Sequence, residues 1–185
     1  KVPPGSTVAV FGLGGVGLSA IQGARIAGAN QIIAVDVFEN KLAMAREVGA
    51  THVVDASSGD PVQAIMEMTG GGVEYSFEAI GKKKTAEQAF ESLRGGGTAT
   101  IIGMIPEGEK LELDGASFLW EKKIQGSDMG SNHFKVDMPK YIEMYLQGRL
   151  KLDEMITRRG RLEDVNEAFR AMKAGEVART VLMCD

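Results

Sequence analysis

Three glycines and one aspartate stand where their residue types and spacing could bind an anionic ligand. Gly12, Gly14 and Gly17 follow an apolar run at 8–11 in the spacing G-x-G-x-x-G, and a second apolar run at 32–35 ends in Asp36. A glycine turn lets a strand turn sharply and lets the backbone approach phosphate groups closely. The helix that follows points unpaired N–H groups and the positive end of its dipole at the phosphates. This spacing predicts a dinucleotide-binding turn.

The acidic residue indicates which dinucleotide would bind. Asp36 can accept hydrogen bonds from both ribose hydroxyls of an adenosine, and it would repel a 2′-phosphate. Val37 and Phe38 supply no cation to balance that repulsion. We therefore predict NAD rather than NADP. A glycine triplet could also mark a turn that only packs a helix, and FAD enzymes and some methyltransferases share the same turn.

The elements around these residues alternate between apolar runs and helical patterns, which predicts a parallel, doubly wound α/β sheet. In such a sheet the carboxyl ends of the strands meet at one rim, where a ligand binds. The glycine turn, Asp36 and the residues at 79–81 and 102–104 all fall on that rim. Strands are predicted at 7–11, 31–36, 52–54, 73–78 and 98–102, and helices at 15–28, 39–48, 61–69 and 85–93, the last closed by the glycines at 95–97.

The pattern changes after Pro106. Alternation of polar and apolar residues at 110–113 predicts a half-exposed strand, and a sixth strand is predicted at 123–126. Two further helices are predicted at 139–147 and 162–174, with a turn into a strand at 150–157 and a last strand at 180–183.

Composition excludes several classes of protein. The net charge of −4 argues against a nucleic-acid surface, and no apolar run approaches the ~20 residues of a membrane span. One cysteine, Cys184, cannot form an internal disulfide, so a reducing cytoplasm is the default compartment. One cysteine and two isolated histidines cannot build a zinc site of the Cys₂His or Cys₄ type, so we predict no catalytic and no metal-binding residue here. The sequence begins at Lys1 in a linker-like segment, and we expect it to be part of a longer protein.

Over essentially its whole length the chain resembles the zinc-containing medium-chain alcohol dehydrogenases. The resemblance rests on five runs: VAVFGLGGVGLSAIQGARIAGA, IIAVDVFENKLAMAREVGATHVV, GVEYSFEAIG, TATIIGM and GRLKLDEMITRRGRLEDVNEAFRAMKAGEVARTVL. It implies a six-stranded, NAD-binding Rossmann domain over residues 1–127. Residues 128–185 would form the C-terminal portion of a catalytic domain whose N-terminal portion is absent.

The resemblance also implies a set of cofactor-binding residues. The glycine turn would hold the pyrophosphate with Val16 behind the nicotinamide, and Asp36 and Lys41 would lie near the adenosine ribose. Two strand ends would line the ribose and the carboxamide, and Arg179 would reach the pyrophosphate. The complete set is Gly12, Leu13, Gly14, Gly15, Val16, Gly17, Asp36, Lys41, Ala79, Ile80, Ile102, Gly103, Met104 and Arg179.

The function implied is hydride transfer between a primary alcohol, or a formaldehyde adduct, and NAD, with zinc expected only in the full-length protein. The chain alone would not oxidise an alcohol. The resemblance further implies a homodimer or homotetramer in which Leu111 and Leu113 lie on a strand that pairs with its symmetry mate. Two alternatives stay open: a zinc-independent enzyme similar to quinone reductases, which Asp36 disfavours, and a non-catalytic NAD-binding module.

Overall fold

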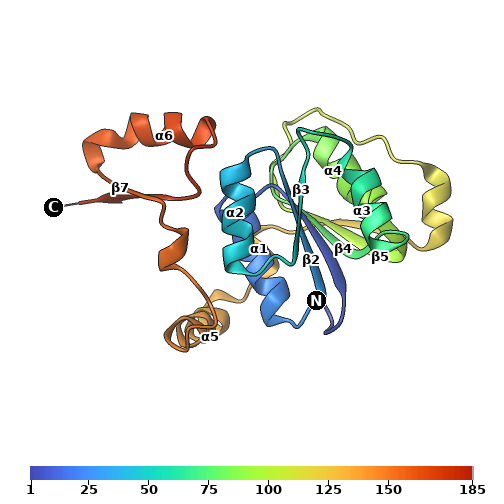
Figure 1. Ribbon diagram of the computed structural model, residues 1–185, viewed down its shortest axis with the longest axis horizontal. Coiled ribbons are helices and arrows are strands. Elements are labelled where there is room, and N and C mark those ends of the chain that lie inside the picture. The colour runs from blue at the N-terminus through green and yellow to red at the C-terminus, as the bar shows by residue number, and fades with distance from the viewer. Residues whose placement is uncertain (185) are drawn as a thin grey trace. The chain divides into compact units, whose positions relative to one another are not determined.

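The computed structural model of the chain describes residues 1–184. Six parallel strands form one sheet in the order β3-β2-β1-β4-β5-β6. Figure 1 shows helices α1 and α2 on one side of this sheet and α3 and α4 on the other. The elements are β1 (Thr7–Phe11), α1 (Gly15–Ile26), β2 (Gln31–Asp36), α2 (Glu39–Val48), β3 (His52–Asp55), α3 (Pro61–Thr69), β4 (Val73–Glu78), α4 (Lys83–Glu91), β5 (Leu93–Ile101) and β6 (Lys123–Gly126). The predicted doubly wound parallel sheet is confirmed.

Strands β1 and β2 are almost entirely apolar because helices cover both faces of the sheet. Val8, Val10 and Ile33 have no solvent-exposed area, and Phe11 is 1% exposed. The register then aligns the strand ends: Phe11 lies opposite both Val35 and Glu78. The segments that follow β1, β2, β4 and β5 therefore leave the sheet at one rim, as predicted.

The glycine segment before the fifth strand differs from the prediction. The helix predicted at 85–93 is α4, which ends at Glu91, and β5 begins at Leu93 and includes the three glycines. Val73 pairs with Leu93 and Tyr75 with Thr98, so β5 contains extra residues that form a bulge. Gly96 takes a positive φ of 77° there. The glycines permit a bulge in the strand rather than a turn before it.

The strand predicted at 110–113 is wrong, because this segment is irregular in the structure. Its polar groups bond to helix α4 instead of to a neighbouring strand. The Glu112 amide donates to Glu87 Oε1 at 2.7 Å, and Lys83 Nζ lies 2.7 Å from Glu112 Oε1. A 3₁₀ helix, η1 (Gly115–Trp120), follows and places the Phe118 ring 5.3 Å from that of Phe90. The sixth strand lies where it was predicted.

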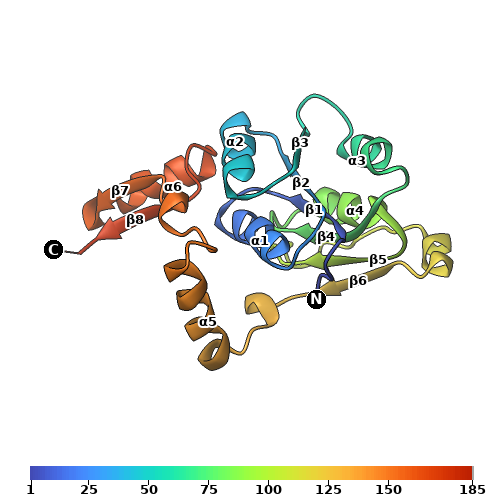
Figure 2. The same ribbon diagram turned by 60° about the horizontal axis from the view of Figure 1, so that its bottom comes forward.

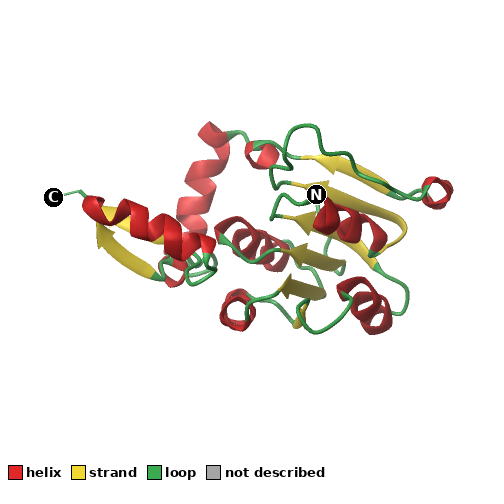
Figure 3. Cartoon of the chain, turned by 90° about the horizontal axis from the view of Figure 1, so that it is seen from above, coloured by secondary structure: helices red, strands yellow, loops and turns green. Residues whose placement is uncertain are grey.

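The chain divides into two compact units, Lys1–Asn132 and a second unit that begins at His133. The second contains α5 (Phe134–Leu146), β7 (Arg158–Arg161), α6 (Val165–Lys173) and β8 (Thr180–Met183), with short 3₁₀ segments between them (Figures 2 and 3). Helix α5 begins five residues before the predicted start. Its N-cap is His133, whose amide donates to Asp137 Oδ2 at 2.8 Å inside the first turns of the helix. Pro139 lies in its second turn.

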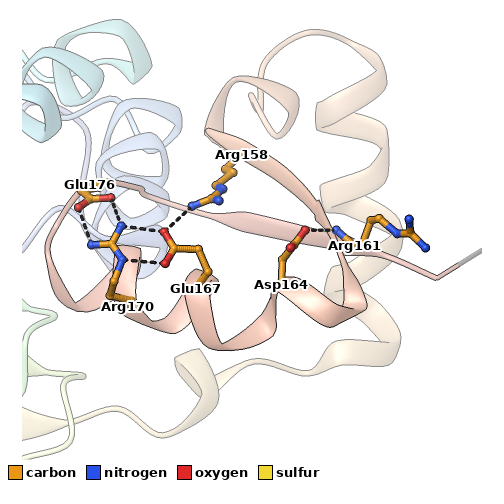
Figure 4. Close-up of polar contacts among 6 residues, drawn as sticks. All are labelled: Arg158, Arg161, Asp164, Glu167, Arg170 and Glu176. Carbon is orange, nitrogen blue, oxygen red and sulfur yellow. Dashed lines mark hydrogen bonds and ion pairs between the residues drawn. The ribbon is translucent and has the colours of Figure 1, made fainter.

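In the second unit, charged side chains tie α6 to its surroundings (Figure 4). The guanidinium of Arg170 bridges Glu167 and Glu176 at 2.8 and 2.9 Å, and Arg158 lies 3.4 Å from Glu167. Strands β7 and β8 pair in parallel beside this helix. Among the described residues, no helix is both long enough and apolar enough to cross a membrane.

Candidate cofactor-binding site

The glycine turn after β1 is packed so closely that two of its glycines have no room for a side chain. Gly12 has a φ of 90°, and a Cβ there would lie 2.3 Å from Ile80 Cγ1. A Cβ on Gly17 would lie 1.7 Å from the carbonyl oxygen of Gly12. Gly14 differs, because a Cβ there would meet no protein atom within 4 Å. The turn is therefore closed toward the protein at two positions and open at the third.

Helix α1 begins at this open position. Its N-cap is Gly14, whose missing side chain leaves the first turn without a side-chain cap. The first N–H groups of a helix have no acceptor within the helix, so they can bind an anion. Gly15, Val16 and Gly17 form that first turn, and Val16 is 53% exposed. The geometry fits a pyrophosphate that takes the place of a capping side chain.

Asp36 is 8% exposed and connects the glycine turn to the end of β2. Its Oδ2 accepts the Leu13 amide at 2.8 Å, and its Oδ1 accepts the amides of Val37 and Phe38 at 2.8 and 3.1 Å. A carboxylate can accept about four hydrogen bonds, so roughly one acceptor position remains free for a ligand, whereas the sequence predicted bonds from both ribose hydroxyls. The aspartate thus has a structural role, which the sequence did not reveal, beside the binding role predicted for it.

A pocket of about 300 Å³ opens between the ends of β1, β2 and β4. Lys41 is among the residues that line it, with Nζ 5.1 Å from the centre of the Phe38 ring, a cation–π contact. Seven predicted residues meet in this pocket, namely Gly12, Leu13, Gly14, Asp36, Lys41, Ala79 and Ile80. The other residues that line it are Phe11, Val35, Val37, Phe38, Ala56, Lys82, Thr85 and Gln88.

These additional lining residues differ in how far the sequence could have indicated them. Val37, Phe38 and Ala56 directly follow β2 and β3, so the rule that strand ends meet at one rim could have identified them. Lys82 and Thr85 lie at the start of α4, and Gln88 lies within it. Their position depends on how this helix packs across the sheet, for which the sequence contains no local signal.

The predicted residues after β5 lie on the same rim but outside the pocket lining. The amides of Ile102 and Gly103 donate to the Glu78 carbonyl at 2.9 and 3.0 Å, so this segment crosses directly beside the end of β4. Met104 is 91% exposed. The two strand ends touch through glycines, since a Cβ on Gly103 would lie 2.0 Å from the Gly81 nitrogen.

Arg179 is the one predicted residue that belongs to the second unit. It precedes β8, and its carbonyl accepts the Thr157 amide at 3.0 Å. With Val165, Phe169 and Met172 of α6 it lines a separate pocket of about 300 Å³ within that unit. Its role at a cofactor stays a prediction.

The described residues contain no group of three or more histidine, cysteine, aspartate or glutamate side chains arranged to hold a metal ion. Cys184 is exposed and unpaired. A zinc site of the family type therefore does not fit the side chains that this part of the chain provides.

Comparison with known proteins places this fold in a family. The family described as zinc-binding dehydrogenase matches residues 15–147. An alcohol dehydrogenase zinc-binding domain protein from Burkholderia ambifaria is 37% identical with a TM-score of 0.95, and covers 100% of this chain and 50% of its own. Benzyl alcohol dehydrogenase from Acinetobacter calcoaceticus is 32% identical with a TM-score of 0.96, and covers 100% of this chain and 51% of its own.

A third solved structure adds a cofactor. A zinc-binding dehydrogenase from Sinorhizobium meliloti 1021, bound to NADP, is 32% identical with a TM-score of 0.83, and covers 100% of this chain and 52% of its own. The present chain thus spans about half the length of the solved structures that it matches. On the extent of the family match and the likeness to these structures, the chain belongs to the zinc-binding dehydrogenase family.

Proposed function

We propose that the first unit binds NAD. The observation that supports this most strongly is the position of Asp36, whose carboxylate lies in the pocket and accepts the Leu13 amide of the glycine turn. A negative charge at this point disfavours a 2′-phosphate, whereas its remaining acceptor position suits a ribose hydroxyl. The adenosine part of the cofactor would then lie between the ends of β1, β2 and β4.

The chain's own residues would bind and orient the cofactor. The first-turn amides of α1 would hold the pyrophosphate beside Gly14, and Asp36 and Lys41 would fix the ribose. The backbone after β5, from Ile102 to Met104, would adjoin the nicotinamide end of the cofactor, which supplies hydride transfer when bound.

For the complete protein we propose the oxidation of a primary alcohol, or of a formaldehyde adduct, by NAD. This proposal is supported by the family match and by the two similar structures whose names include alcohol dehydrogenase. Zinc would be bound by parts of the protein outside this chain, since the described residues hold no metal cluster. Residues 128–185 would belong to the catalytic domain.

NADP is a second candidate cofactor, because a relative with 32% identity is bound to it. Two lysines, Lys41 and Lys82, line the pocket beside Asp36 and could balance the charge of a 2′-phosphate. The carboxylate of Asp36 is nearly buried beside the turn, and on that ground we favour NAD.

Titration of the 185-residue chain with NADH and NADPH by calorimetry tests the proposal. We expect NADH to bind at least tenfold more tightly than NADPH. Gly14→Ala should weaken NADH binding at least tenfold while the melting temperature changes little, because its methyl group meets no protein atom. Failure of the unaltered chain to bind either nucleotide would overturn the proposed function, and tighter binding of NADPH would overturn the choice of NAD.

A further inference from the structure

Glu78, at the end of β4, is an acid with no exposed surface at all. Its Oε1 accepts three hydrogen bonds, from the amides of Ile80 and Gly81 at 2.9 Å each and from Thr85 Oγ1 at 2.7 Å. Its Oε2 is buried and has no hydrogen-bonding partner among the described residues. A buried carboxylate with one unpartnered oxygen is costly, so an apolar side chain would suit a sheet core better.

The three donors connect Glu78 to the wall of the cofactor pocket. Two of them belong to the turn that follows β4, and the third belongs to helix α4. Ala79, Ile80 and Thr85 from these two segments line the pocket. A single carboxylate oxygen therefore holds the turn and the start of the helix at a fixed distance from each other.

Backbone atoms around Glu78 leave its carboxylate little room to move. Its carbonyl accepts the amides of Ile102 and Gly103, which ties the segment after β5 to the same residue. A Cβ on Gly103 would lie 2.6 Å from Glu78 Oε2 and 2.0 Å from the Gly81 nitrogen. Backbone atoms thus enclose the carboxylate, and its reach to the two amides depends on the full length of the side chain.

We propose that Glu78 is a positioning residue for the cofactor: its Oε1 holds the turn at 79–81 and Thr85 in the geometry that the adenosine half requires. This inference rests on the proposed function. It requires the reach and the acceptor atom of the side chain, and it does not require the negative charge. Two conservative variants separate these properties, since glutamine keeps the reach and aspartate keeps the charge.

Calorimetric titration of the 185-residue chain with NADH and with ADP-ribose tests this. Glu78→Gln retains an oxygen for the three donors, and we expect both affinities to stay within about threefold of the unaltered chain. Glu78→Asp is shorter by one methylene, and we expect both affinities to fall at least tenfold. Thr85→Val removes one donor and should give a smaller loss in the same direction, which serves as the test if Glu78→Asp does not fold.

Ser76→Ala is the matched control for a loss of stability alone. Ser76 lies two residues earlier on β4, is also fully buried, and donates to the Ala89 carbonyl at 2.6 Å away from the pocket lining. We expect it to lower the melting temperature without changing either affinity. The inference is overturned if Glu78→Asp and Thr85→Val bind normally, if Glu78→Gln binds as weakly as Glu78→Asp, or if Ser76→Ala weakens binding equally. If the unaltered chain binds neither probe, the proposed function fails first.

Discussion

Two glycines of helix α1, Gly17 and Gly23, have opposite surroundings, which makes them a matched pair. An added Cβ on Gly17 would collide with the Gly12 carbonyl, whereas one on Gly23 would meet nothing within 4 Å. We expect Gly17→Ala to destabilise the fold by about 1–3 kcal/mol through overpacking and to weaken NADH binding at least tenfold. Gly23→Ala should stabilise it by roughly 0.5–1 kcal/mol, because alanine favours a helix. Chemical denaturation and NADH titration of both variants measure these effects, and equal stabilities would contradict the packing argument.

Asp36→Asn tests the charge at the pocket while keeping the size of the side chain. The new amide cannot accept the Leu13 amide if its oxygen keeps the two bonds to Val37 and Phe38, so some stability is lost. That loss affects both nucleotides alike, and the ratio of their affinities is therefore the informative quantity. Removing a unit charge near a phosphate is worth roughly 1–4 kcal/mol, so we expect the ratio to shift at least about fivefold toward NADPH. An unchanged ratio in calorimetric titrations would show that Asp36 does not discriminate between the nucleotides.

Single residues could be predicted where the chemistry is local in sequence. The spacing of Gly12, Gly14 and Gly17 and the place of Asp36 after a strand were sufficient to assign them to one rim. Glu78 was missed because an acid at the end of a strand usually indicates exposure. Its burial arises from the turn that follows and from helix α4, which are neighbours only in the folded chain.

At the scale of elements, the sequence was informative where an apolar run was long and bounded. Strands β1, β2, β4 and β6 lie where their residues predict. For β1 and β2 the reason is that a strand buried on both faces must be almost entirely apolar. The alternation at 110–113 was misleading because this segment forms its hydrogen bonds with side chains of α4 rather than with a neighbouring strand. Helix α5 begins before residue 139, where the sequence predicted it, and the contact at its start, from the His133 amide to Asp137, joins residues that carry no usual capping signal.

The ion pairs of helix α6 give a prediction about pH. Arg170, with a smaller contribution from Arg158, lowers the pKa of Glu167 from 4.5 to about 2. Because the folded pKa is lower than the unfolded one, the pair stabilises the unit above about pH 4.5 and is lost as the pH falls toward about 2. We expect carbon-13 NMR to show the Glu167 carboxyl titrating near this lower value. Added salt should weaken the effect, because these side chains are partly exposed.

Arg170→Gln should return the titration of Glu167 toward 4.5, because the main source of the shift is removed. Lys173→Gln is the matched control: it removes an equal charge from the same helix, from a residue that is not among the causes of the shift. If Glu167 titrates near 4.5 in the unaltered chain, or responds equally to both variants, the ion pairs of Figure 4 do not form in solution.

At the scale of the whole molecule, strand β6 forms one edge of the six-stranded sheet. This strand pairs only with β5, and its residues are mostly exposed. An unpaired edge is a template for another strand, and a second copy of the chain is one way to cover it. Our prediction of a homodimer or homotetramer relied on a strand at 110–113, which is absent, so the proposal now rests on β6.

We therefore expect the 185-residue chain to self-associate through β6. The Ser127 amide donates to the Ile101 carbonyl at 3.0 Å, so by alternation along the strand the Gly126 amide faces the free edge. Gly126→Pro removes this outward donor and should shift the chain toward monomer in light scattering, with little loss of the sheet itself. Gly126→Ala is the matched control, because it keeps the amide and its Cβ meets no atom within 4 Å. A monomer at high concentration in the unaltered chain, or equal masses for both variants, would exclude this edge as the interface.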